Sequence, residues 1–323
     1  MPCVIGVDIA KHTFDIATLQ ANGKYRTKAK LSNTSAGFKV LDDWLLKHAE
    51  PEAWIVMEAT GIYHEGLADH LHTGGYRVCV LNPAQLASYA ASQLQRVKTD
   101  RVDAKLIAAY GLRHADTLRP WQPEAPAIRQ LRALVRRLQD LQEIAQMERN
   151  RLLVSEPRVQ ASIRSVLEHV EQQIAETRQA IRDHIDDDPD LRNQRDLLVS
   201  IDGIADTTAA LLLAELGDPL RFTDARAITA FAGLNPRLQE SGKHKGHVCI
   251  SRQGSSRLRA GLYLPSVSAL NSNEAIKAMT QRLEQRGKAG KQIVCAAMRK
   301  LLHIVYGVLK SGQPFDAQRA LAH

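Results

Sequence analysis

Residues 3–32, CVIGVDIAKHTFDIATLQANGKYRTKAKLS, predict how the fold begins. Residues 3–9 and 13–19 have the length and the β-branched content of buried strands. The Asn-Gly dipeptide at 22–23 favours a tight hairpin turn, so residues 25–32 are predicted to return as a third strand. Three strands in so short a stretch indicate a sheet at the start of the first domain.

The sequence after this hairpin alternates between helical and strand patterns. Apolar residues recur at helical spacing after Ser35, and residues 53–59 and 76–82 predict two more buried strands. Further helices are predicted at 63–72, 84–93 and 100–114. The order predicts a mixed sheet with helices packed against it.

Composition narrows the class of protein. The 323 residues allow two or three domains, and 44% hydrophobic content allows a substantial core. A net charge of +8 and a pI of about 9.4 favour a polyanionic partner. We expect no membrane span and no signal peptide, because there is no run of 18 apolar residues and no basic leader. Four scattered cysteines argue against a disulfide scaffold or a zinc site and favour the cytoplasm.

Three segments are predicted from the changes in pattern: 1–120, 121–194 and 195–323. Three prolines in residues 119–126 mark the first boundary. Heptad-like spacing on both sides of Pro157 predicts a coiled-coil hairpin or an oligomer interface, which the acidic residues 186–190 end. The last segment is predicted to be mostly helical, with a helix-hairpin-helix-like element around Gly203.

Four carboxylates attract attention in the first segment. Asp8 and Glu58 lie in apolar strands, where an unpaired charge is costly. Asp100 and Asp103 are three residues apart and share one face of a predicted helix. Convergent acids repel one another unless cations neutralise them, and oxygen ligands suit Mg²⁺, with Mn²⁺ as an alternative.

Simpler explanations exist for three of these acids. Asp100 and Asp103 fit a helix N-cap and its capping box, and taken alone capping is the better interpretation. Asp8 can pair with Lys11 or Lys105. What favours a metal site is the order of first strand, later strand and following helix, which fits a ribonuclease-H-like core. Four other aspartates of the segment are expected to be solvated at the surface: Asp15, Asp42, Asp43 and Asp69.

The motifs GVDIAKHTFDIATL, MEATGIYHEGLADHL, VLNPAQ and KTDRVDAKLIA together resemble the DEDD recombinases of bridge-RNA-guided insertion sequences, a family that includes relatives of the Piv DNA invertase. The resemblance implies a RuvC-like domain whose four acids are Asp8, Glu58, Asp100 and Asp103. It extends to residues 231–266, where QESGKHKG corresponds to the segment with a serine nucleophile. It therefore implies that Ser241 attacks DNA, although this chain has Lys243-His244 where some relatives are richer in serine.

Nucleic-acid contacts are predicted from the residues themselves. Gly203 lies at a turn before a helix N-terminus, where backbone N–H groups can hold a phosphate; an ordinary helical hairpin is the alternative. Basic residues cluster in 237–259, where a solvated loop is the alternative. The predicted phosphate contacts are Lys98, Arg237, Lys243, Lys245, Arg252, Arg257 and Arg259. Ser251, Ser255 and Ser256 compete with Ser241 as nucleophile when only the residues are considered.

The expected function is that of a DNA recombinase or transposase acting in the bacterial cytoplasm by Mg²⁺-assisted serine transesterification. The resemblance further implies target and donor duplex DNA, a non-coding guide RNA, and a homo-oligomer, a dimer or tetramer. Three rivals remain open: a metal-only nuclease, a non-catalytic nucleic-acid scaffold, and an actin-like or sugar-kinase-like ATPase. Ala10-Lys11 stands where such ATPases carry Gly-Thr, and no second Gly-rich loop is visible.

Overall fold

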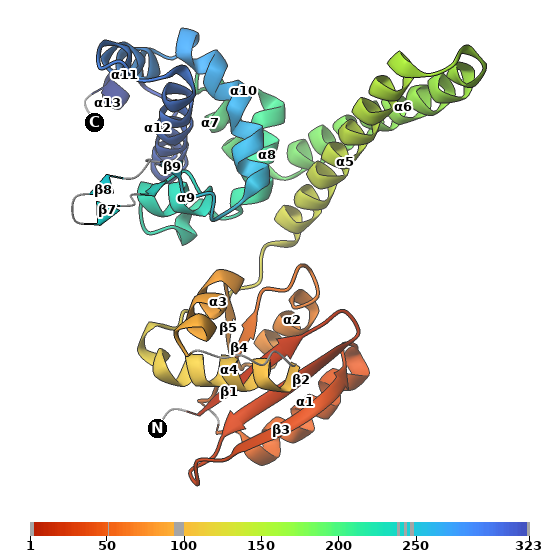
Figure 1. Cartoon of the computed structure of the whole chain (residues 1–323), viewed down its shortest axis with the longest axis vertical. Helices are drawn as coiled ribbons and strands as arrows, with labels where there is room; N and C mark the ends of the chain where they lie inside the picture. Colours follow the sequence, from red (N-terminus) through yellow and green to blue (C-terminus); the bar gives the residue numbers. More distant parts are fainter. Residues whose placement is uncertain are drawn as a thin grey trace. The chain divides into compact units, whose positions relative to one another are not determined.

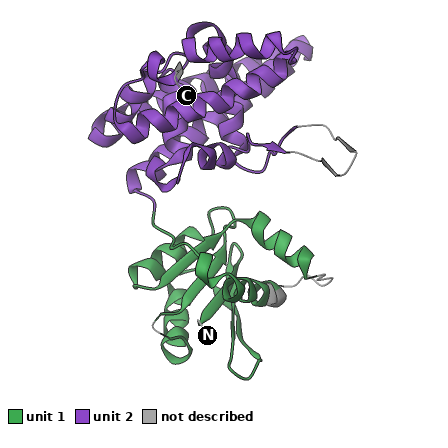
Figure 2. Cartoon of the chain, turned by 90° about the vertical axis from the view of Figure 1, so that its left-hand side faces the viewer, with its two compact units in different colours: residues 1–123 green, residues 124–323 purple. Residues whose placement is uncertain are grey.

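The computed structural model describes residues 3–50, 52–93, 100–237, 240–241, 244–245 and 249–321. The chain divides into two compact units, Met1–Pro123 and Glu124–His323 (Figure 2). The first unit contains a mixed sheet with helices, and the second is mostly helical (Figure 1). The architecture is therefore α/β followed by α.

The first unit is built on one five-stranded sheet in the order β3-β2-β1-β4-β5. The strands β1, β2 and β3 are antiparallel neighbours, whereas β4 and β5 run parallel to β1. Gly23 adopts a φ of +76° in the predicted turn between β2 and β3. The strand bounds are β1 (Val4–Ile9), β2 (Thr13–Leu19), β3 (Tyr25–Ser32), β4 (Trp54–Glu58) and β5 (Arg77–Leu81).

Helices cover both faces of this sheet because its central strands are apolar on both sides. The helices α1 (Ser35–His48) and α2 (Glu65–Thr73) pack against Ile5, Val7 and Met57. On the other face, α3 (Pro83–Ser92) and α4 (Asp100–Arg113) contribute to a cluster with Val4 and Val56. Alternate residues of β1 and β4 thus face opposite helical layers. A short 3₁₀ turn, Ala115–Thr117, follows α4.

The contact between α4 and β1 is unusually close at Gly6. A Cβ atom at Gly6 would lie 2.2 Å from the carbonyl oxygen of Ala104 and 2.3 Å from the nitrogen of Ala108. A Cβ atom at Gly111 would lie 2.7 Å from Val4. Later residues of the helix therefore meet earlier residues of the strand. It follows that α4 runs back along β1, with its first turn towards the end of the strand that carries Asp8.

The second unit begins with a helical hairpin of α5 (Pro126–Val154) and α6 (Pro157–Asp187). The predicted seam lies between these two helices: Leu131, Leu138, Leu141 and Ala145 are buried on α5, and Ile163, Val170, Ile174 and Ile181 are buried on α6. The heptad-like pattern is therefore satisfied within one chain. Asp188 ends the hairpin and caps the next helix, accepting from the backbone of Asp190 and Leu191.

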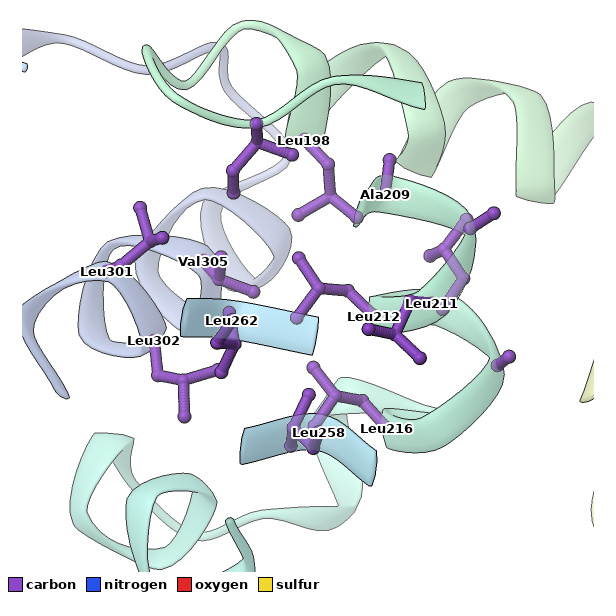
Figure 3. Packing of buried hydrophobic residues seen from close by; sticks show 14 of the residues in the cluster. Leu198, Ala209, Leu211, Leu212, Leu216, Leu258, Leu262, Leu301, Leu302 and Val305 are labelled. Atoms are coloured by element: carbon purple, nitrogen blue, oxygen red, sulfur yellow. The ribbon is translucent and has the colours of Figure 1, made fainter. Parts of the chain in front are cut away.

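The remaining helices pack around an aliphatic core, part of which is shown in Figure 3. The same cluster includes Leu131 and Leu138 of α5. Leu212 of α8, Leu258 of α10 and Leu302 of α12 are fully buried in it. The helix bounds are α7 (Pro189–Val199), α8 (Asp206–Leu216), α9 (Ala225–Phe231), α10 (Ser256–Ser272), α11 (Glu274–Gln285), α12 (Gly290–Ser311) and α13 (Ala317–Leu321), with a 3₁₀ turn at Pro219–Arg221.

Two features of the second unit differ from a plain helical bundle. Four two-residue strands lie between α9 and α10: β6 (Pro236–Arg237), β7 (Glu240–Ser241), β8 (His244–Lys245) and β9 (Cys249–Ile250). Among the described helices, α12 alone is long and apolar enough to cross a membrane, but 50% of its apolar window is buried inside this unit. Its apolar face thus serves the core.

Candidate active site

Asp8 and Glu58 lie at the ends of two neighbouring parallel strands. The register of β1 and β4 pairs Val7 with Met57, so the two acids follow immediately at adjacent positions. Side chains alternate along a strand, and Gly6 and Val56 both face α4. Asp8 and Glu58 are therefore on this same face, where each is partly exposed.

The first turn of α4 supplies the other two acids. Asp103 precedes Ala104, whose carbonyl lies against Gly6, and its side chain is partly exposed. Asp100 is the first described residue of α4, and its side chain lies outside the described part of the chain. The backbone thus brings the start of α4 towards the end of β1 that bears Asp8.

The fit of this site to a metal rests on its oxygen donors. Asp8, Glu58 and Asp103 are carboxylates on one side of the sheet, and each has an interaction partner within the protein. Among the described side chains, no three His, Cys, Asp or Glu residues form a group that could hold a metal ion. The set is hard oxygen in kind, as Mg²⁺ or Mn²⁺ requires. The side chain of the fourth carboxylate, Asp100, is not among these described side chains.

Asn33 joins the two loops that follow the carboxylate-bearing strands. Its Nδ2 donates to the carbonyl oxygen of Tyr63 at 2.9 Å and to that of Ala10 at 3.3 Å. Ala10 follows β1, and Tyr63 lies in the loop after β4. The amide therefore fixes the spacing of these loops. No local pattern in the sequence predicts this contact, since the bonded residues are 23 and 30 positions away.

His64 borders the same loop. Burial lowers the pKa of its imidazole below 6.5, while Glu65 and the backbone of Gly61 and Thr60 act in the opposite direction. Its Nδ1 is buried and has no hydrogen-bond partner among the described residues. The ring is therefore held in its neutral form near neutral pH.

The prediction that Asp15 is solvated at the surface is wrong. Its side chain is only 8% exposed, and its Oδ1 accepts a hydrogen bond of 2.7 Å from the backbone N–H of Lys30. Lys30 has a φ of +56°, beside a register shift between β2 and β3. The carboxylate thus satisfies a backbone donor at a β-bulge. Asp42 is also engaged, at 2.9 Å from Nε2 of His70.

Ser241 lies on a β-ribbon rather than in an irregular loop. It pairs with His244, and Glu240 pairs with Lys245. Pro236 and Arg237 pair with Ile250 and Cys249 nearer the helices. The side chains of residues 240–248 lie outside the described part of the chain. The backbone alone therefore assigns Ser241 to a hairpin that leaves α9 and returns to α10.

Ser255, a rival nucleophile, already has a structural role. Its hydroxyl donates to Oε2 of Glu215 at 2.9 Å and accepts from the backbone N–H of Leu258 at 3.1 Å. Glu215 is 7% exposed and lies 3.8 Å from Nε of Arg136. Ser255 therefore caps α10 and stabilises a buried carboxylate.

The basic residues of this region fall into different classes. Arg237, Arg252 and Arg257 are exposed. Nη1 of Arg259 instead donates to the carbonyl oxygens of Ala232, Gly254 and Ser255 at 2.9–3.3 Å. That nitrogen serves the fold rather than a phosphate. Lys98 and Lys243, and the side chain of Lys245, lie outside the described residues.

Gly203 lies in the turn between α7 and α8, where the helix-hairpin-helix-like element was predicted. Its φ is +100°, and a Cβ atom there would lie 2.8 Å from Cβ of Ala269 and 3.1 Å from the carbonyl of Pro265. Packing against α10 therefore accounts for this glycine. The sequence could not distinguish this contact from an approach to phosphate.

Comparisons with known proteins agree with these features. A DEDD transposase model of the IS110 type matches residues 5–154, and a model described as transposase, IS116/IS110/IS902 family, matches residues 195–281. The pilin gene-inverting protein of Moraxella bovis is 34% identical over 317 residues, which cover 97% of each chain. The mini-circle putative transposase for IS117 of Streptomyces coelicolor is 25% identical over 410 residues, covering 98% of this chain and 96% of that protein. The chain therefore belongs to the IS110-type DEDD transposases, and it is a DNA transposase or recombinase.

Proposed function

We propose that this protein cuts and rejoins DNA at specific sites by serine transesterification, with divalent metal ions at the carboxylates of its first unit. The shared face of Asp8 and Glu58, towards which the first turn of α4 is directed, is the observation that carries this proposal. The positive net charge of +8 supports a nucleic-acid substrate.

Membership of a DEDD family indicates dependence on a divalent metal, and we propose Mg²⁺ held by Asp8, Glu58, Asp100 and Asp103. When bound, such ions neutralise phosphate charge and stabilise the oxygens that enter and leave phosphorus. The carboxylates themselves would fix the position of the scissile phosphate relative to the sheet. Lys and Arg residues close to Asp100 and Asp103 in the sequence would reduce the repulsion between these acids and DNA.

The proposed nucleophile is Ser241. Its Oγ forms a bond to phosphorus while the bond from phosphorus to the 3′ oxygen breaks, and the serine proton is transferred so that a 3′-hydroxyl leaves. The product is a 5′-phosphoserine linkage, and attack by a 3′-hydroxyl reverses the step and rejoins DNA without ATP. The structural role of Ser255 supports Ser241 by removing one competitor. Exposed Arg237, Arg252 and Arg257 are suited to stabilising phosphate charge.

Carboxylates and serine belong to different compact units, so catalysis requires that the two meet around one phosphate. This can happen within one chain or between copies, and a homo-oligomer, dimer or tetramer, with composite sites is part of the proposal. Base pairing with a non-coding guide RNA would supply sequence choice for both target and donor DNA. The inversion implied by the name of the Moraxella relative makes DNA inversion one outcome to test.

The decisive experiment tests for a covalent adduct on end-labelled duplex DNA with Mg²⁺. Ser241→Ala should abolish the adduct while DNA binding persists, and Ser251→Ala should retain it. An adduct that still forms with Ser241→Ala would show that Ser241 is not the nucleophile. Cleavage without any adduct in the unmodified protein would instead identify a metal-only nuclease, in which water attacks phosphorus.

The guide RNA requires a separate observation. RNA that co-purifies with the protein should be sequenced, and one discrete structured RNA encoded beside the gene is expected. Random cellular RNA at the same yield would contradict guidance while leaving the serine chemistry intact.

A further inference from the structure

A cavity of about 340 Å³ lies between α12 and the segment that follows it in the second unit. Basic side chains from both sides line it: Lys300 and His303 from α12, and Arg319 from α13. Asp316 is the acid among its lining residues, and Phe315 adds an apolar wall. The cavity therefore combines concavity, positive charge and an apolar surface, which is the usual composition of a small-ligand site.

His303 in this cavity has an unsatisfied nitrogen. Its Nε2 is buried and makes no hydrogen bond with any residue in the described part of the chain. A buried polar atom without a partner is unfavourable, because it has lost its hydrogen bonds to water. Since the ring also lines the cavity, a ligand there can supply the missing partner.

The charges that face His303 are mostly positive. Arg299 and Lys300 lie on its own helix, Arg226 faces it from α9, and Asp224 before α9 is the opposing acid. Burial comes first and these cations second in lowering the pKa of His303. Arg282 of α11 likewise lowers the pKa of Lys300, after burial.

The other two basic groups keep donors available. Nζ of Lys300 donates to the carbonyl oxygen of Ala320 at 2.9 Å, which uses one of its three hydrogens. Nε of Arg319 lies 3.5 Å from Oδ2 of Asp316, and the Arg319 side chain is 77% exposed. Both cations can therefore reach an additional acceptor without losing their present contacts.

We propose that this cavity binds one backbone phosphate of a nucleic acid, with Lys300 and Arg319 supplying charge and Nε2 of His303 donating a hydrogen bond. The volume lies at the lower end of the range for small-molecule sites, about 300–1,000 Å³, which suits a phosphate and its sugar rather than a base pair. Phe315 offers the sugar an apolar surface. The inference rests on the proposed function in taking nucleic acid as the partner, and it adds a contact outside the carboxylate site and the β-ribbon.

Phosphate binding and protonation of His303 should be coupled, and this coupling can be measured. A phosphate beside His303 favours its charged form, so bound anion should raise the histidine pKa, and acidification should strengthen binding. The charged groups around His303 and the cavity determine how strongly its pKa responds: Arg226, Arg299, Lys300, Arg319, Asp224 and Asp316.

The test uses the full chain with isotope-labelled histidine and inorganic phosphate as the first probe. Phosphate should shift the ring resonances of His303 and raise its pKa, while those of exposed His169 stay constant. Duplex DNA and single-stranded RNA oligonucleotides are then titrated at several salt concentrations. Arg319→Gln and His303→Gln should weaken binding, and Arg319→Gln should lower the salt slope by about 0.9 for duplex or 0.7 for single strands.

The two nucleic acids show which one supplies the phosphate, because only the bound class should lose slope. Arg158→Gln on α6, an exposed position, controls for the loss of one charge, and Arg319→Gln at its exposed site should fold normally. Unchanged slopes with both oligonucleotides would overturn the inference, even if free phosphate shifts the histidine. If the unmodified protein binds neither nucleic acid, the proposed function fails as well, so the two failures are distinguishable.

Discussion

The carboxylates of the first unit and Ser241 of the second are held in contrasting ways. Asp8 and Glu58 extend from interior strands, with helical layers on both faces of the sheet. Ser241 lies on a ribbon of two-residue strands joined to its helical unit through β6 and β9. The proposed roles fit this difference, because metal ligands need a fixed spacing, which a packed sheet provides, whereas a nucleophile must reach a phosphate presented by other elements. The first unit thus holds its carboxylates at fixed positions, whereas the second unit carries its serine on an extended ribbon.

The largest effect should come from the carboxylate side. Asp8→Asn keeps the size but removes the charge and replaces one accepting oxygen by an NH₂ donor, and it should reduce Mg²⁺-dependent strand cleavage more than about 100-fold, since even outer groups of metal sites contribute 10- to 100-fold. The initial rate of plasmid nicking measures this. Asp43→Asn, at an exposed position on α1, should leave the rate unchanged. Normal nicking by Asp8→Asn would show that Asp8 is not needed for cleavage, and the proposed division of roles between the two units would then lose support.

A second prediction separates the two units by stability. Leu212→Ala opens a cavity in the fully buried core of the second unit and should cost about 2–5 kcal/mol of unfolding free energy there. Hydrogen exchange in the first unit should not change, because its core clusters are separate. Leu153→Ala, at a position 84% exposed, is the control and should be nearly neutral. Coupled loss of protection in both units would contradict independent cores.

Gly6 tests how rigidly α4 is fixed. Gly6→Ala places a methyl group within about 2.3 Å of two backbone atoms of α4, and overpacking of this kind costs about 1–3 kcal/mol. We expect a lower melting temperature and reduced cleavage, as the helix moves away from Asp8. Gly66→Ala in α2 meets only Phe38 at 4.0 Å and should be neutral or stabilising. Equal behaviour of the two variants would show that α4 has room to adjust.

Asn33 tests whether the loops beside Asp8 and Glu58 hold these carboxylates in position. Asn33→Ala removes both hydrogen bonds that join the two loops, and we expect about a 10-fold loss of rate with a higher Mg²⁺ requirement. Asn33→Asp retains the size but has no N–H to donate, so it should behave like the alanine variant. A Mg²⁺ titration of nicking distinguishes a positioning role from loss of packing. If Asn33→Asp is fully active, the hydrogen bonds have no part in positioning.

The smallest effect should be a pH dependence shared by both units. His64 and His303 have pKa values lowered by burial, so between these values and 6.5 the unfolded chain binds more protons than the folded chain. Folding stability should therefore be fully present above about pH 6.5 and decline as the pH falls through that range. Urea denaturation from pH 5 to 8 measures the slope, which His64→Gln should remove only from the first unit. A slope that persists there would point to other titrating groups.

Local patterns predicted the first unit well, because its strands carry their own signals. Residues 13–19 and 25–32 form β2 and β3 with the predicted bounds, and the Asn-Gly dipeptide forms their turn. The heptad-like seam predicted α5 and α6 for the same reason. In these segments the hydrophobic periodicity and the turn residues favour the same elements, and the tertiary structure retains them.

Contacts between distant residues explain what the sequence did not predict. Asp15 is charged and follows a phenylalanine in a strand, yet only its bond to Lys30 shows that it completes a bulge. Gly203 and Arg259 were predicted to contact phosphate, but α10 and three carbonyls account for the glycine and for one nitrogen of the arginine. No strands were predicted around Ser241, where a solvated loop was the alternative to phosphate contact, because Gly and Lys disfavour strands. The metal, serine and phosphate roles themselves remain predictions.

The length of the helical hairpin in the second unit amplifies small movements at its base. With 29 residues, α5 is about 43 Å long, and near its base Nε of Arg132 donates to the carbonyl oxygen of Ala214 in α8 at 2.7 Å. A tilt of only about 10° at that base would displace the far end by roughly 7 Å, about the rise of five helical residues. A molecule bound at the tip of the hairpin would thus be moved by small repacking around α8, at the base of the hairpin.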